Sequence, residues 1–394
     1  MSQLPIEGSC DAAFAAVRER FEEHFVRHPA GGPAELGASV SVVVAGRTVV
    51  DLWGGHADAA RTRPWVRDTV SMAASCTKGL TALVAAQQVA RGALDPDALV
   101  SRYWPEYGCA GKEDTRVWDL FTHAAGQPTL GVKLEPPGSL WSWDVAVSAF
   151  AAGAPQWVPG SAHGYHAFSF GHLCGEVVRR VSAGRTVAEL LRSDVAGPLG
   201  VDVLLAVRPD ELARCAELVA PPAESPFAAV GHSGDETDFA TLTRYDDKRL
   251  LSAAAGNSLQ WKRAGWPAAG AFTNARALAR IYGALALGGT LDGHELIGRD
   301  ALQTLTKTHR RGTDRILGGE SAFAFGWQTP AAAILQHAGA RGFGHPGGWG
   351  SLGWADPDLQ LGFGYTLNQT WALMGDPRAV RLYEAAAQCA RGAG

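Results

Sequence analysis

A serine and a lysine three positions apart, Ser75 and Lys78, are the residues of this 394-residue chain best placed to do chemistry. Residues three apart in a helix lie on one face, so a helix that starts here would bring the hydroxyl and the amine together. Serine becomes a nucleophile when a neighbouring base takes its proton, and a desolvated lysine can be that base. The spacing alone is a weak signal, because such pairs also occur by chance.

The sequence around the pair indicates a helix that begins at Ser75. Apolar residues recur at helical spacing from Leu80 to Val89. At the start of a helix, free N–H groups and the positive end of the dipole favour an alkoxide. The alternative is that Ser75 only caps the helix and that Lys78 lies on the surface. That alternative leaves unexplained why the lysine stands among alanine, leucine and threonine.

Two further segments have the character needed to complete such a site. Tyr165 lies on a loop after a Pro-Gly pair, just before a predicted helix, and could relay a proton if a nearby ammonium lowers the pKa of its phenol. Residues 342–351 are rich in glycine, and exposed N–H groups there could form half of an oxyanion hole, with the N–H of Ser75 as the other half. A packing tyrosine and a plain glycine-rich turn are the alternatives.

The composition predicts a large core and excludes several classes of partner. Hydrophobic residues make up 46% of the chain, and the net charge is −4 without a basic run, which argues against nucleic acid or an anionic membrane. No apolar stretch is long enough to span a bilayer, and the first eight residues show no signal-peptide pattern. The six cysteines are scattered, so we expect them to be reduced in a cytoplasmic protein. The histidines show no metal-ligand spacing, and no cofactor motif is visible, so we expect neither a metal nor a cofactor.

The predicted elements form a sheet at each end of the chain with helices between them. Two hairpins are predicted, at residues 39–44 and 48–53 around Gly46-Arg47, and at residues 350–355 and 359–367. Helices are predicted from Phe14 to Phe25, at 170–181, at 186–195 and after Asp376-Pro377. Each β region is too small for a stable sheet alone. We therefore expect one sheet domain from residues 1–72 and 275–394, a mainly helical domain at 73–274, and an active site between them.

Together, the Ser-x-x-Lys motif, Tyr165 and the His-Pro-Gly segment at 345–347 resemble the motifs of the serine β-lactamase and penicillin-binding-protein superfamily. Their order and spacing match, and the resemblance covers nearly the whole chain. Within the superfamily, the chain is most similar to the class C β-lactamase-like family VIII carboxylesterases. The resemblance implies a β-lactamase-like fold of the α+β or α/β class, in which an antiparallel sheet flanked by helices carries an inserted helical domain.

The resemblance also implies a role for each motif residue. Ser75 would be the acylated nucleophile, Lys78 its base partner and Tyr165 the proton relay. Segment 345–347 replaces the family's Lys-Thr-Gly, and the N–H of Gly348 would join that of Ser75 around the oxyanion. The cycle would acylate Ser75 with loss of an alcohol or amine, and water would then attack the acyl-enzyme.

The substrate-binding positions depart from the β-lactamase pattern. Ala167 stands where those enzymes place an asparagine, and His345 stands where they place a lysine that grips the substrate carboxylate. An imidazole is mostly neutral at pH 7. With Gly347 and Trp349, which we expect to line the pocket, these residues favour substrates that lack an obligatory carboxylate.

The expected function is therefore hydrolysis of small carboxylic esters through an acyl-enzyme on Ser75. An acyltransferase or an amide hydrolase of a secondary-metabolite pathway would use the same intermediate and is the main alternative. A β-lactamase or DD-peptidase, or a non-catalytic binding protein, fits the sequence less well. The expected partner is a small ester or amide, and the sequence predicts neither the acyl length nor the oligomeric state.

Overall fold

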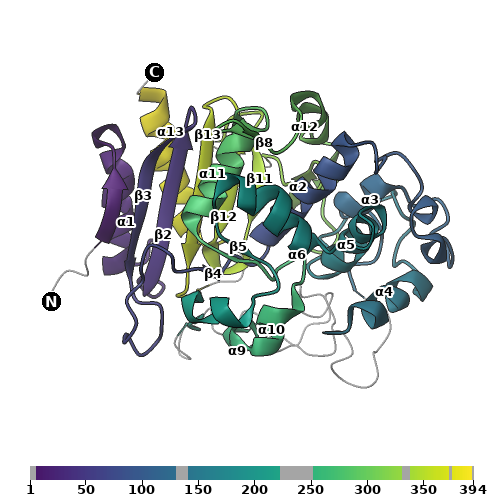
Figure 1. Cartoon of the computed structure of the whole chain (residues 1–394), viewed down its shortest axis with the longest axis horizontal. Helices are drawn as coiled ribbons and strands as arrows, with labels where there is room; N and C mark the ends of the chain where they lie inside the picture. Colours follow the sequence, from purple (N-terminus) through teal and green to yellow (C-terminus); the bar gives the residue numbers. More distant parts are fainter. Residues whose placement is uncertain (1–5, 130–140, 222–251, 331–337, 372–374, 393–394) are drawn as a thin grey trace.

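Both ends of the chain contribute strands to one central antiparallel sheet (Figure 1). The computed structural model describes residues 6–129, 141–221, 252–330, 338–371 and 375–392. In spatial order, the six strands are β1 Ile6–Cys10, β3 Arg47–Gly55, β2 Gly37–Val44, β13 Leu361–Leu367, β12 Leu352–Asp356 and β11 Phe343–Pro346. Strands β2 and β13, from opposite ends of the chain, pair along seven positions at the centre.

Helices cover both faces of this sheet. Helices α1 (Ala15–Val26) and α13 (Pro377–Gly392) pack against the face that carries the alternate apolar residues of β13. Helix α11 (Ala275–Ala286) lies on the other face, where Gly362 and Gly364 let its backbone approach closely. A Cβ at Gly362 would lie 2.1 Å from a backbone nitrogen of α11, so this face of β13 must carry glycine there.

The helical region lies on the side away from both chain ends (Figure 1). Its central helix, α2 (Cys76–Ala90), is buried along nearly its whole length and packs against α5 (Ser169–Val181) and the edge strand β11. The other helices are α3 Val117–Phe121, α4 Trp143–Ala152, α6 Val187–Leu190, α7 Gly197–Leu199, α9 Ala253–Asn257, α10 Leu259–Ala264 and α12 Arg299–Leu305. The described residues also form smaller sheets. One contains β4 Ser71–Met72, β6 Phe272–Thr273 and β5 Val203–Leu204. Two others are the pair β9 Arg310–Thr313 with β10 Glu320–Phe323 and the pair β7 Thr290–Leu291 with β8 His294–Glu295.

The predicted hairpins are present, but both strands of the second one, β12 and β13, begin two residues later than predicted. The first turn is centred on Ala45 and Gly46, one residue earlier than predicted, because both adopt left-handed φ angles as a two-residue hairpin turn requires. The predicted cap of the last helix is confirmed: the Asp376 carboxylate accepts a hydrogen bond from the Arg378 N–H at 3.0 Å. The predicted helix at 186–195 is α-helical only as far as Leu190 and continues as a π-helical segment.

None of the helices in the described ranges is long and apolar enough to cross a membrane. Strands β4 and β6 lie at the two predicted domain boundaries in the sequence and pair with each other, and β6 also pairs with β5 from within the predicted helical domain. The division of the chain at residues 72 and 275 stays a prediction.

Candidate active site

Ser75 lies at the sharp turn that leads from β4 into α2. The preceding residue, Ala74, has a φ of +44°, a left-handed conformation that is uncommon for residues other than glycine. The Ser75 side chain makes no capping hydrogen bond to the helix. Its Oγ instead lies 3.1 Å from Nζ of Lys78, and the Lys78 side chain is completely buried. The interpretation of a capping serine beside a surface lysine is therefore wrong.

Two backbone carbonyls hold the Lys78 amine in place. Nζ donates to the carbonyl oxygens of Ala167, at 2.7 Å, and Ala268, at 3.0 Å. Burial lowers the pKa of Lys78 to about 7, since removing an ammonium from water costs more than these neutral acceptors return. When the amine is neutral, its two N–H groups can donate to these two carbonyls. The lone pair then faces the Ser75 hydroxyl, which is the geometry of a general base.

Tyr165 is buried beside Lys78 and completes a group of three side chains with the half-buried Ser75. The Lys78 Nζ lies 4.9 Å from the centre of the Tyr165 ring. Burial raises the pKa of the Tyr165 phenol above its usual value, and a side-chain hydrogen bond with Ser75 opposes this rise only in part. The expectation that a nearby ammonium lowers this pKa is therefore wrong, because desolvation dominates. Tyr165 stays protonated near neutral pH and can donate its proton.

A buried carboxylate fixes the backbone at Tyr165. The Asp314 side chain is completely buried between β9 and β10. Its Oδ1 accepts the N–H of Tyr165 at 3.0 Å and also the N–H groups of Ile316 and Leu317. Its Oδ2 accepts the hydroxyl of Ser321. Asp314 could not be identified from the sequence, because a single aspartate in a polar loop carries no motif.

The glycine-rich segment lies directly beside the Ser75 turn. The Ser351 hydroxyl donates to the carbonyl of Ala73 at 2.9 Å, and the Cys76 thiol donates to the carbonyl of His345 at 3.1 Å. A Cβ at Gly347 would lie 2.4 Å from the Ala73 carbonyl, so this close approach requires glycine. The predicted proximity of segment 342–351 to Ser75 is therefore present in the structure.

Two amides remain available to bind an oxyanion between these segments. Within the described ranges, the N–H groups of Ser75 and Gly348 have no hydrogen-bond acceptor. Both residues lie at starts of helical turns, Ser75 before α2 and Gly348 in the 3-10 turn Gly348–Gly350. Such N–H groups point outward from the turn and can bind negative charge.

His345 is buried and neutral, and its tautomer is set by its own backbone. Burial lowers the pKa of the imidazole to about 3, with Lys78 as a smaller contribution. The ring Nδ1 lies 2.6 Å from the carbonyl of Pro346, which can only accept, so Nδ1 carries the proton. Nε2 is then an acceptor, and it has no partner among the described residues. An acceptor here cannot grip a carboxylate as a lysine would.

The tryptophans near the motifs differ in their roles. Trp349 is half-buried, and it has a φ of +67° directly after Gly348. Trp354 is completely buried in the core of the sheet, so it cannot line a pocket. Trp141 stacks on Trp266 at 4.6 Å between ring centres, and Trp266 lies two residues before Ala268, a carbonyl partner of Lys78. The sequence analysis did not single out Trp266.

Comparisons with known proteins identify the family of the chain. Residues 21–388 match the family model described as Beta-lactamase. The esterase/beta-lactamase LipL of Mycobacterium tuberculosis (strain ATCC 25618 / H37Rv) is 33% identical over 370 residues, which is 92% of this chain and 82% of LipL. Two similar crystal structures are a family VIII carboxylesterase and a penicillin-binding protein homolog from Caulobacter crescentus. Each is 36% identical with a TM-score of 0.86 and covers 98% of this chain and 100% of its own.

These relatives confirm the predicted fold and the predicted enzyme class, a serine ester hydrolase on a β-lactamase-like scaffold. The family match spans far more than half of the chain, and it includes every motif from Ser75 to Gly348. The chain belongs to the β-lactamase family.

Proposed function

We propose that this enzyme hydrolyses small carboxylic esters through an acyl-enzyme on Ser75. The observation that carries the proposal is the position of the buried Lys78 amine, which donates to two backbone carbonyls and lies 3.1 Å from the Ser75 Oγ. With a pKa of about 7, a large fraction of this amine is neutral near neutral pH and can take the hydroxyl proton.

The remaining groups suit the steps that follow. As the Ser75 Oγ attacks the ester carbonyl carbon, its proton passes to Lys78 Nζ, and the N–H groups of Ser75 and Gly348 bind the oxyanion. The protonated Tyr165 then gives a proton to the departing alkoxide and is reprotonated from Lys78. Water enters by the reverse route and releases the acid.

The residues around Ser75 favour substrates without a carboxylate near the scissile bond. His345 is neutral and buried, so it supplies no positive charge for a carboxylate, and Ala167 has only a methyl group where the β-lactamase pattern places an amide. The half-buried Trp349 and Trp141 supply apolar surface, and Trp141 is held by stacking on the buried Trp266. We infer that apolar acyl or alcohol groups are accepted and that β-lactam carboxylates are bound poorly.

Intact-protein mass spectrometry with p-nitrophenyl acetate and butyrate tests the proposal. We expect an acyl adduct on the native enzyme that decays in water, and no adduct on Ser75→Ala, whose fold loses only one hydroxyl. Decay that requires an added amine or alcohol would instead indicate an acyltransferase. If neither an adduct nor released nitrophenol is found, the protein is a non-catalytic binding protein.

All six cysteines are free, which is consistent with the proposed cytoplasmic location.

A further inference from the structure

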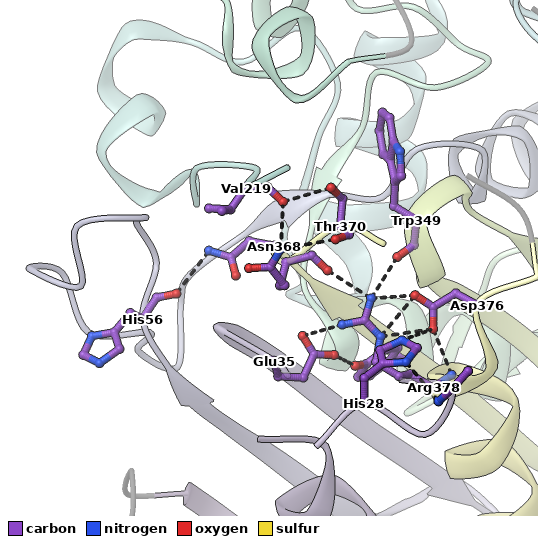
Figure 2. A network of polar contacts seen from close by, with 12 residues as sticks. His28, Glu35, His56, Val219, Trp349, Asn368, Thr370, Asp376 and Arg378 are labelled. Atoms are coloured by element: carbon purple, nitrogen blue, oxygen red, sulfur yellow. Dashed lines mark hydrogen bonds and ion pairs between the residues drawn. The ribbon is translucent and has the colours of Figure 1, made fainter. Parts of the chain in front are cut away.

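A completely buried arginine joins the first turn of α13 to the loop that carries the proposed oxyanion donor (Figure 2). Nη2 of Arg378 donates to the carbonyl oxygen of Gln369 at 3.0 Å and lies 3.4 Å from the carbonyl oxygen of Trp349. Trp349 directly follows Gly348. In Figure 2 the Trp349 carbonyl faces Arg378, whereas its ring points away from the network.

Two carboxylates fix the orientation of the Arg378 guanidinium. Asp376 accepts from Nε at 3.0 Å and also contacts Nη2. Glu35 Oε2 lies 3.0 Å from Nη1, and the hydroxyl of Tyr365 donates to the other oxygen of Glu35. His28 Nε2 lies 3.6 Å from Asp376. The guanidinium is planar, and its Nε and Nη1 groups are paired with these carboxylates. Its Nη2 group is therefore directed at the carbonyl oxygens of Gln369 and Trp349.

The loop that Arg378 contacts has a backbone that needs external support. Trp349, at a φ of +67°, occupies the left-handed region, which is costly for a bulky side chain. The next residue, Gly350, has a φ of +115°, and a Cβ there would lie 2.8 Å from Oδ2 of Asp376. The loop is therefore packed on the same carboxylate that orients Arg378, and its conformation depends on that cluster.

We propose that Arg378 is a positioning residue for ester hydrolysis, which holds residues 347–350 so that the N–H of Gly348 stays aimed at the oxyanion. This inference rests on the proposed function. Stability alone is a poor explanation for the cluster, because apolar replacements of buried ionic groups are often neutral or stabilising. If the loop at residues 347–350 must keep one conformation, a planar guanidinium with several N–H donors is a suitable group to hold it.

The proposal predicts a particular kinetic signature. Oxyanion contacts form fully only in the transition state, so a loosened loop lowers kcat and leaves KM nearly unchanged. Complete removal of an oxyanion donor costs about 10²- to 10³-fold in kcat, so partial misplacement by Arg378→Lys should cost about tenfold. Lysine keeps the charge but cannot contact both carboxylates and both carbonyls at once.

The kinetic test compares variants of one network with a matched control. We would measure kcat per titrated active site for p-nitrophenyl butyrate in Arg378→Lys, Asp376→Asn, Glu35→Gln and the control Arg192→Lys, which alters an ion pair with Glu211. We expect about tenfold lower kcat in the first two variants. Glu35→Gln should lower kcat less than these two variants, because a glutamine oxygen can still accept from Nη1 and Nη2 retains its own partners. If Arg378→Lys does not fold, the kcat values of Asp376→Asn and Glu35→Gln are compared with each other and with that of Arg192→Lys.

Hydrogen–deuterium exchange of the folded variants supplies a readout that does not depend on activity. Peptides that cover residues 343–352 should exchange faster in Arg378→Lys and Asp376→Asn than in Glu35→Gln or Arg192→Lys. Unchanged exchange in this segment would overturn the proposal, as would a loss of kcat that follows thermal stability equally in all four variants. Absence of an acyl adduct in the native enzyme would refute the proposed function instead, while the exchange data still show whether Arg378 holds the loop.

Discussion

At the scale of single residues, the protonation state of Lys78 should set the pH dependence of the enzyme. A base with a pKa of about 7 is protonated and inactive at lower pH, so kcat/KM should rise as pH increases through about 7 and then level off. Lys78→Arg keeps the positive charge but cannot lose a proton near neutral pH, and should cost about 10²-fold or more. A stopped assay with p-nitrophenyl acetate across this range measures both effects. A flat profile would show that Lys78 is not the base.

Tyr165 should matter most for poor leaving groups. Burial keeps its phenol protonated, so its role is to donate a proton to the departing alkoxide. Tyr165→Phe should lower turnover of an ethyl ester by about 10²-fold or more. The loss should be smaller with a p-nitrophenyl ester, whose phenolate departs without a proton. Comparison of the two esters by product formation measures this difference, and equal losses would contradict a donor role.

The residue types of the site could be predicted, but their backbone partners could not. Ser75 and Lys78 stand three apart, so helical geometry alone brings them together. The acceptor that completes the lysine site, the carbonyl of Ala268, lies 190 residues further along the chain. Every residue has a carbonyl, so no sequence signal marks this one. The direction of the Tyr165 pKa was also mispredicted, because burial cannot be read from a loop sequence.

At the scale of elements, the hairpin of β9 and β10 should control the position of Tyr165. Asp314→Asn keeps the shape of the side chain but replaces one acceptor oxygen of a group that receives three N–H bonds and a hydroxyl. We expect a fall in kcat of about tenfold and a lower melting temperature. Asp358→Asn, which alters an exposed ion pair with Arg341, is the control and should change neither.

The strands were easier to predict than the ends of the helices. The β-branched run at 39–44 predicts β2 (Gly37–Val44) to within two residues, and such a run is typical of a strand that is buried on both faces. Thr186 gives the start of its helix through a capping box with Glu189. The change to a π-helical segment at Leu191 was not predicted, because apolar spacing and capping residues do not distinguish a π-helical turn from an α-helical one.

At the scale of the whole molecule, joining strands from both ends of the chain is what places the glycine-rich segment beside Ser75. The sequence predicted this arrangement because neither β region is large enough to form a sheet alone. The cluster around Arg378 was not predicted, because its partners come from separate parts of the chain. They lie in the loop before β2 (Glu35), in the segment after β13 (Gln369) and in the loop after β11 (Trp349). These segments meet only in the folded sheet.

Burial of neutral histidines should make the folded state sensitive to acid. Burial lowers the pKa of His24, His166 and His172 to about 4 and that of His345 to about 3, whereas the unfolded chain binds these protons near pH 6.5. The unfolded state therefore binds more protons below pH 6.5, and stability falls as pH drops from there toward 4. Each such histidine lowers the free energy of unfolding by about 2 kcal/mol between pH 7 and pH 5.

Glu35 has the opposite effect on stability, because burial raises the pKa of its carboxyl group to about 7. Its contribution to the free energy of unfolding is therefore present at low pH and is lost as pH rises through 7. One carboxylate cannot offset four imidazoles, so net stability should decline in acid. The test is His172→Phe, since this imidazole packs among the rings of Trp143, Phe150 and Trp266 and has no hydrogen-bond partner in the described part of the chain. Urea unfolding at pH 7 and pH 5 should show a decline about 2 kcal/mol smaller than in the native enzyme. The exposed His294→Gln should leave the decline unchanged, and an equal decline in all three proteins would mean that buried histidines do not govern acid stability.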